Sequence, residues 1–258
     1  MLKKLSIALL IVILVVAVFP ISALADPTDD SASDPLKGID ISIGTTDNPD
    51  SMASSLQIIV LLTILALLPS LLIMMTGFVR ILIVLGLTRN ALGLQQTPPN
   101  QVIIGLALFL TLFIMGPALE TIYEDAWQPY VNGEIGQEEA MELGMAPLRD
   151  FMVKQTYQSD LSMFMDIAQI NSATTLDDIP TRVIIPAFLI SELKRAFQIG
   201  FLIFLPFLII DMLVASVLMS MGMMMLPPVM ISMPLKIMIF VLAGGWQLVI
   251  STLVKSFA

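Results

Sequence analysis

The sequence predicts an all-helical, membrane-associated protein, and three observations support this class. Hydrophobic residues make up 57% of the chain and charged residues only 13%, about half the charged share of a typical soluble domain. Four apolar segments approach or exceed the roughly 20 residues that cross a bilayer as a helix; they cover approximately residues 55–87, 101–119, 183–221 and 234–254. The charges avoid these segments, since all but two of the 21 acidic residues lie between Asp26 and Asp50 or between Glu120 and Asp178.

The first 25 residues are typical of a secretory signal peptide. Two lysines precede an apolar run, Leu5–Phe19, and a small-residue site ends at Ala25. We expect cleavage between Ala25 and Asp26; the alternative is an uncleaved first anchor. Residues 26–51 are rich in Asp, Ser, Thr, Gly and Pro and have few large apolar side chains. They are therefore expected to form a flexible extracytoplasmic arm.

The apolar segments are expected to pair as two long helical hairpins, which span residues 52–119 and 183–258. The first hairpin turns through Arg89–Asn100, where a Pro-Pro pair cannot continue a helix. The second turns through Met221–Pro234, which contains one glycine and three prolines. Residues 120–182 form a polar, acidic insertion, in which Gln137–Thr156 fits a short helix and nothing indicates an independent domain.

The orientation follows from the signal peptide, which places Asp26 outside the membrane. Arg80 and Arg89 then lie at the cytoplasmic turn of the first hairpin, as the positive-inside tendency requires, and residues 120–182 are periplasmic. The second hairpin fits less well, because its basic residues gather at the outer end: Arg182, Lys194 and Arg195. This conflict indicates helices that pack against other protein subunits.

Asp211 lies inside an apolar stretch, Leu205–Val217, and an isolated carboxylate in hydrocarbon normally has a partner. Lys236 opens the last apolar helix and is the candidate partner, from the same subunit or from a neighbour. The pair has two interpretations, proton or ion handling and a structural bridge that fixes helix register. We favour the structural bridge, because one Asp–Lys pair without a chain of further acids is a poor proton relay.

Three other charges lie at expected helix ends. Arg80 follows a long uncharged run, and we expect its side chain to extend to the membrane interface. Glu192 and Arg195 are three residues apart on one helix and are expected to neutralise each other. Gly244 and Gly245 are expected to permit close helix approach, which is a packing role.

Methionine gathers at the second turn, where Met223, Met224 and Met225 are consecutive. Flexible apolar Met side chains from several subunits would form a deformable seal around a passing chain. The ordinary interpretation is gap filling, since the chain has 19 methionines. Their position in a turn broken by Gly and Pro favours the seal, because irregular backbone at membrane depth is tolerated chiefly where it is buried or lines a cavity.

The composition excludes most catalytic chemistry. With no Cys and no His, the chain has no thiolate or histidine catalysis and no Cys/His metal site. An intramembrane protease is not supported, because Asp211 lacks a second membrane carboxylate and Ser232 with Lys236 lacks an oxyanion element. Clustered basic residues for nucleic acid are also missing. We predict a protein that is not an enzyme and has no cofactor or metal; an ion-coupled transporter is the alternative, although the hairpins show no internal repeat.

Three passages carry a resemblance to a known family: LTRNALGLQQTPPNQ at residues 87–101, SELKRAFQIGF at 191–201 and MSMGMMMLPP at 219–228. With their surroundings, Leu61–Leu110 and Ile185–Val249, they make the sequence similar to the FliP family of flagellar type III export-gate proteins. That family is related to the SctR proteins of injectisome secretion systems. The resemblance covers essentially all of the mature chain.

The resemblance implies a pore-forming subunit that conducts unfolded flagellar proteins across the bacterial inner membrane, at the flagellar basal body. It implies five copies in a helical ring completed by FliQ and FliR and raised out of the bilayer plane, with FlhA, FlhB and the assembly factor FliO as further partners. It also implies that Met223, Met224 and Met225 form the gasket of the closed pore and that Asp211 and Lys236 support assembly and export. An injectisome-type gate subunit is the alternative within this resemblance.

Overall fold

The computed structural model describes residues 59–60, 62–63, 66–67, 70–170, 176–223 and 226–257. The predicted signal peptide with its expected cleavage site between Ala25 and Asp26, the predicted arm at 26–51, and both Met224 and Met225 lie outside these residues. The chain divides into two compact units, Met1–Leu72 and Ile73–Ala258. The described residues of the first unit are helical and exposed.

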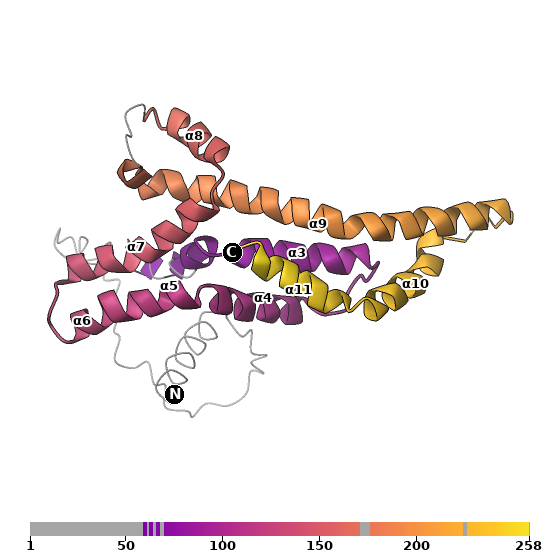
Figure 1. Ribbon diagram of the computed structural model, residues 1–258, viewed down its shortest axis with the longest axis horizontal. Helices are drawn as coiled ribbons and strands as arrows, with labels where there is room; N and C mark the ends of the chain where they lie inside the picture. Colours follow the sequence, from indigo (N-terminus) through magenta and orange to yellow (C-terminus); the bar gives the residue numbers. More distant parts are fainter. Residues whose placement is uncertain are drawn as a thin grey trace, which may run out of the picture. The chain divides into compact units, whose positions relative to one another are not determined.

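The described residues of the second unit form helices, turns and short connections without a strand (Figure 1). In chain order these are α3 (Phe78–Ala91), α4 (Asn100–Ile114), α5 (Gly116–Thr121), the π-helix η1 (Ile122–Trp127), α6 (Gln128–Val131), α7 (Gln137–Gln155), α8 (Gln158–Ile167), the 3₁₀-helix η2 (Leu176–Asp178), α9 (Thr181–Ser220), α10 (Pro228–Leu242) and α11 (Gly245–Lys255). The predicted all-helical class is confirmed.

Helix α9 runs for 40 residues, which at the helical rise is about 60 Å. Among the described residues it is the one helix that is long and apolar enough by itself to cross a bilayer. Two bent pairs qualify only if each counts as one span: residues 100–114 with 116–131, bent by 62°, and α10 with α11, bent by 66°. The described part of the chain therefore holds one to three candidate spans.

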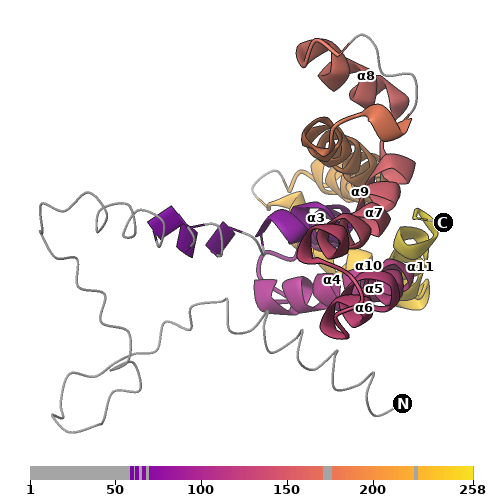
Figure 2. The same cartoon turned by 90° about the vertical axis from the view of Figure 1, so that its left-hand side faces the viewer.

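Helix α3 lies between α9 and α4 and contacts both (Figure 1 and Figure 2). The turn between α3 and α4 falls at residues 92–99, inside the stretch where a break is predicted. Arg89 bridges this turn, because its Nη1 donates to the carbonyl of Pro98 at 3.2 Å and to Oδ1 of Asn100 at 2.7 Å. This arginine therefore ties the end of α3 to the start of α4.

Helix α9 ends in a Schellman motif. Gly222, with φ +75°, donates its N–H to the carbonyl of Met219, and Met223 donates to the carbonyl of Leu218. A residue in the left-handed conformation closes a helix in this way most easily when it is glycine. Helix α10 then folds back and contacts α9.

The predicted second turn, Met221–Pro234, extends too far, because α10 already begins at Pro228. Proline suits the first position of a helix, where its missing N–H has no intrahelical partner to lose. Pro234 lies inside α10 without ending it. The turn therefore ends at Pro227.

The last apolar segment consists of two helices that meet at Gly244. This residue has φ +61°, a left-handed conformation that lets α11 leave α10 at an angle. A Cβ added to Gly245 would lie 2.2 Å from the ring of Phe240. The two glycines, predicted only to permit close helix approach, therefore differ: Gly244 makes the bend and Gly245 makes room for Phe240.

The acidic region rests on the N-terminal half of α9. Helix α7, which covers most of the stretch where the sequence fits a helix, packs on η1 and α9, and α8 packs on α9 (Figure 2). Met152, Ile184 and Phe188 are fully buried in the core that joins these helices. Burial of each such side chain contributes about 1.5–3 kcal/mol. The acidic region is therefore part of the helical body.

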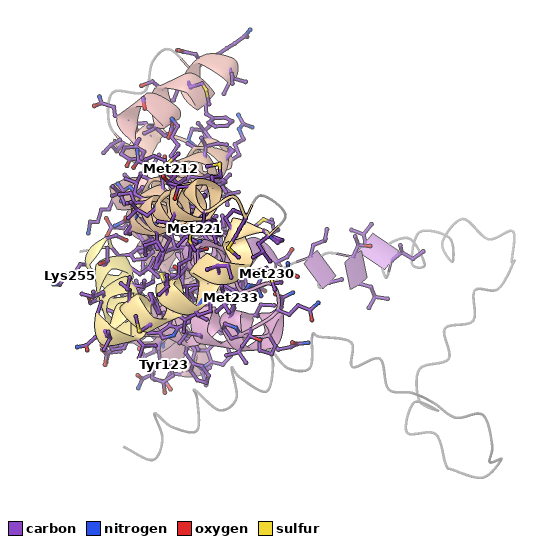
Figure 3. All side chains as sticks on the ribbon, turned by 90° about the vertical axis from the view of Figure 1, so that its right-hand side faces the viewer. Tyr123, Met212, Met221, Met230, Met233 and Lys255 are labelled. Carbon is purple, nitrogen blue, oxygen red and sulfur yellow. The ribbon has the colours of Figure 1, made fainter. Side chains whose placement is uncertain are left out.

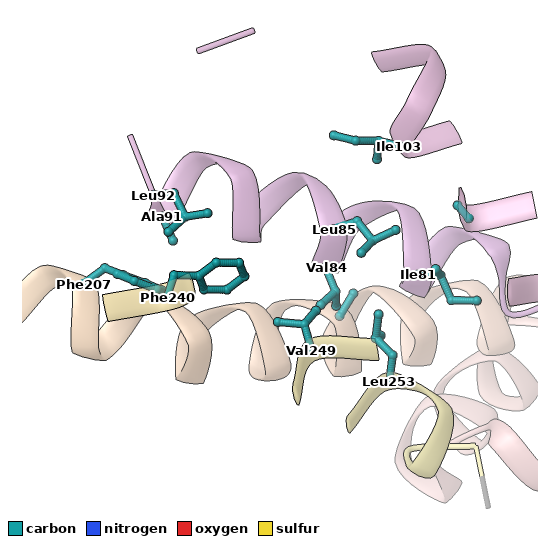
Figure 4. Packing of buried hydrophobic residues seen from close by; sticks show 12 residues of the cluster. Ile81, Val84, Leu85, Ala91, Leu92, Ile103, Phe207, Phe240, Val249 and Leu253 are labelled. Carbon is teal, nitrogen blue, oxygen red and sulfur yellow. The ribbon is translucent and has the colours of Figure 1, made fainter. Parts of the chain in front are cut away.

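A second core joins α3 and α4 to α9, α10 and α11 (Figure 4). Its most buried members include Ile81, Val84, Leu85, Phe207, Phe240 and Leu253. Other apolar side chains of α9 and α10 are uncovered: Leu202 and Leu213 on α9 are 66% and 62% exposed, and Leu242 at the end of α10 is 79% exposed. Of the most apolar 18-residue stretch of α9, only 11% is buried, and so much exposed apolar surface indicates contact with lipid or with other subunits.

Candidate functional site

The turn between α9 and α10 presents methionine side chains (Figure 3). Met219, Met221 and Met230 are more than half exposed, and Met223 is 40% exposed. Met223 is the member of the predicted gasket that the structure describes. Met223 and the neighbouring Met221 therefore stand at an uncovered end of the α9–α10 pair.

The structure brings Asp211 and Lys236 together within one chain. Lys236 Nζ lies 2.5 Å from Asp211 Oδ2, and the hydroxyl of Ser232 donates to Asp211 Oδ1. Nζ also donates to the carbonyl of Ala91, the last residue of α3, at 3.2 Å. Ser232 and Lys236 are buried, whereas the Asp211 side chain is 30% exposed. The group joins α3, α9 and α10, and the sequence does not reveal the parts of Ser232 and Ala91.

Arg80 is expected to extend to the membrane interface, but its side chain is completely buried. Its Nε donates to Glu192 Oε2 at 2.9 Å, and its Nη2 pairs with Glu192 Oε1 and donates to Gln155 Oε1. Its Nη1 donates to the carbonyl of Ser256 at 2.8 Å, and its guanidinium lies over the ring of Phe257 at 3.8 Å. The planar fork of arginine matches a carboxylate bidentately, which makes this buried position tolerable.

Glu192 and Arg195, which are expected to neutralise each other, form no ion pair. Both carboxylate oxygens of Glu192 are bound by Arg80, which lies 112 positions away in sequence. Arg195 donates instead to Gln155 Oε1 at 2.6 Å and lies over the ring of Tyr157 at 4.7 Å. A buried bidentate partner is stronger than a neighbour three residues along a helix surface.

Asp160 is a buried carboxylate that no pattern in the sequence distinguishes from the other acidic residues of its region. The hydroxyl of Ser191 donates to its Oδ2 at 2.8 Å, Lys194 Nζ pairs with its Oδ1, and the N–H of Tyr157 donates to Ser191 Oγ. Burial by itself raises the pKa of this carboxyl, but the hydrogen bonds from Lys194 and Ser191 and the charge of Lys194 lower the pKa below its ordinary value. The cluster fastens α8 to α9.

Within the described residues, no group of three or more acidic side chains is placed to hold a metal ion. The polar side chains described above are used to join helices: Asp211 and Lys236 near the turn, Arg80 and Glu192 in the middle, and Asp160 on α8. Together with the uncovered apolar surface, they define an all-helical, membrane-associated protein that is held together internally by buried charges.

Residues 61–253 match the model of the FliP family. The chain is 52% identical over 217 residues to the "Flagellar biosynthetic protein FliP" of Bacillus subtilis. This match covers 84% of this chain and 98% of that protein. The proteins of the same name from Pectobacterium carotovorum and Aquifex aeolicus are 53% and 51% identical; each match covers 80% of this chain, and 80% and 87% of the relative. This chain belongs to the FliP family.

Proposed function

We propose that this chain is a pore-forming subunit of the flagellar type III export gate and conducts unfolded flagellar proteins across the inner membrane. Its family and the names of its relatives support a part in flagellar biosynthesis. The apolar α9 supports a place in the membrane. The protein acts by assembling and by opening a path, without catalysis or a cofactor.

The main support for a pore is the exposure of the methionine side chains at the α9–α10 turn. Met221 and Met230 are 67% and 63% exposed in the single chain, and Met223 lies between them. Methionine has flexible torsions and no hydrogen-bond geometry to satisfy, so it adapts to different apolar surfaces. Repeated around a ring, Met223, Met224 and Met225 would close against one another at rest and yield to a passing chain.

The uncovered apolar surface supports assembly with other subunits. Two buried ion pairs, Arg80–Glu192 and Asp211–Lys236, are matched within the chain, whereas large apolar side chains along α9 and α10 are left exposed. The assembly that we propose has five copies in a ring completed by FliQ and FliR, together with FlhA, FlhB and the assembly factor FliO. A mature chain that begins at Asp26, with residues 120–182 on the periplasmic side, belongs to the same proposal.

A permeability measurement tests the seal. Met223→Ala, Met224→Ala and Met225→Ala combined should raise the leak of ions and the sensitivity of cells to small toxic molecules, because truncated side chains leave the closed pore open. The matched control replaces two exposed methionines of α7 and α8, Met141 and Met163, with alanine. An unchanged leak in cells whose gate is shown by co-purification to be assembled would contradict the pore.

A further inference from the structure

We propose that Ser232 and the C-terminal end of α3 act with Asp211 and Lys236 as a clamp that fixes the register of α10 against α9 and thereby positions the methionine turn. The clamp is defined as the side chains of Asp211, Ser232 and Lys236 and the carbonyl of Ala91. Its consequence for sealing rests on the proposed function, whereas its effect on helix register does not.

Both carboxylate oxygens of Asp211 accept hydrogen bonds within the clamp. Asp211 Oδ1 accepts from Ser232, and Oδ2 accepts from Lys236. The ammonium of Lys236 has a second acceptor in the carbonyl of Ala91, which is one of the last four carbonyls of α3 and lacks an intrahelical donor. A cation at this position also complements the negative end of the α3 dipole. Lys236 therefore links three helices at one point.

The clamp lies close to the methionine turn, so it determines how the two helices enter that turn. Asp211 lies nine residues before the last residue of α9, about 14 Å along the helix. Past it, among the described residues 212–223 and 226–231, no side-chain hydrogen bond or ion pair joins α9 to α10. Apolar contacts alone permit sliding and rotation, whereas a buried polar group that must find its partner admits one register. The clamp is the last such group before the methionines.

Ser232 is the positioning residue of this group. Lys236 is long and flexible, and with it alone the carboxylate of Asp211 is free to rotate about its side-chain bonds. Ser232 is short and completely buried on the same face of α10, one helical turn before Lys236. Its hydroxyl therefore fixes the second carboxylate oxygen and with it the rotation of α10.

A cysteine pair reports the register, because the chain has no cysteine of its own. A Cβ at position 93, just after α3, would lie 3.9 Å from the Cβ of Met233 on α10, within the range of a disulfide. Gly93→Cys with Met233→Cys should form this bond under mild oxidation in membranes that contain the full chain and its partner subunits. Gly93 has φ +77°, so a cysteine there is strained, and Gly93→Ala with Met233→Cys must first be shown to assemble like the unmodified chain. If it does and the cysteine pair still forms no disulfide, the placement of α10 against the end of α3, and with it the clamp, is overturned.

The variants are then compared in this cysteine background. Ser232→Ala should lower the disulfide fraction formed in a fixed time by about threefold or more, because the carboxylate loses a charge-assisted bond. Ser232→Thr, which keeps the hydroxyl, should restore it. Ser220→Ala is the matched control, since the hydroxyl of Ser220 bonds only within α9, to the carbonyl of Val217. An equal disulfide yield in Ser232→Ala and the parent would overturn the clamp.

Permeability of Ser232→Ala without the cysteines separates the two proposals. A lowered disulfide yield together with a leak supports both. A lowered yield with intact sealing, when the methionine replacements also fail to leak, refutes the pore and leaves the clamp standing. A leak with an unchanged disulfide yield refutes the clamp and leaves the pore standing.

Discussion

Arg80 is the largest side chain that is fully buried among the described residues. Its five N–H donors are directed at Glu192, Gln155 and Ser256, so the guanidinium replaces its lost hydration with protein acceptors. Sequence reasoning treats such an arginine as a surface group because its partners are distant along the chain. The lone Asp211 was easier to interpret, because it has few charged neighbours in sequence and Lys236 is the candidate cation on the following helix.

Replacing Arg80 tests whether this buried pair is structural. Arg80→Met should lower the free energy of unfolding by about 3–5 kcal/mol, because Glu192 is left buried without its cation. Arg80→Met with Glu192→Leu should recover much of the loss, since both charges are then gone. Lys154→Met, which breaks an exposed pair with Asp150, is the control and should change little. Thermal unfolding of the purified complex measures all three, and equal effects of Arg80→Met and the control would refute the structural role.

Asp160 predicts a pH dependence of stability. Its pKa is lower in the folded chain than in the unfolded chain, so its contribution is complete above the unfolded pKa of about 4 and is lost as the pH falls through the lower folded pKa. Asp160→Asn should therefore be less stable than the parent at pH 7, with a difference that shrinks toward pH 3. Unfolding midpoints across this range measure it, and exposed Asp166→Asn is the control. A difference that stays constant with pH would contradict the assignment.

At the scale of elements, the sequence predicts where apolar helices lie better than where they bend. The turn at Gly222 and Pro227 could be predicted, because glycine and proline coincide with the end of an apolar run. Pro234 looks the same in sequence, yet α10 continues through it, since the helix loses one hydrogen bond and keeps its apolar contacts. The sequence does not predict the bend at Gly244, because the residues on both sides of it are apolar. Hydrophobicity gives no information about the backbone angles of a residue.

The three glycines of these helices should respond differently to alanine. Gly244→Ala should cost about 1 kcal/mol, because φ +61° is strained for any residue with a Cβ although the space around it is open. Gly245→Ala should cost more, since its Cβ would overlap Phe240, and Phe240→Leu should relieve part of that cost. Gly86→Ala, in the open interior of α3, should instead stabilise the protein slightly. Unfolding temperatures that do not follow this order would contradict the assigned roles.

At the scale of the whole molecule, the sequence alone locates single unusual charges but not the networks that they form. Arg80 meets Gln155 across 75 positions and Glu192 across 112, and Asp160 meets Lys194 across 34. These partners lie on different helices, so no periodicity or spacing connects them. Only the packing of α3, α7 and α8 on α9 brings the groups together.

The uncovered apolar surface leads to the last prediction, which concerns assembly. Leu213 lies on the apolar half of α9 and is 62% exposed. Met141 lies on α7, outside this apolar surface, and is 65% exposed. If that half packs on neighbouring copies, Leu213→Lys should disrupt the complex, because an ammonium would be buried there without a partner, whereas Met141→Lys should leave it intact. Native mass spectrometry of the detergent-extracted complex, co-expressed with its neighbouring subunits, counts the copies; five are expected for the parent, and a lone chain covered only by lipid would contradict the assembly.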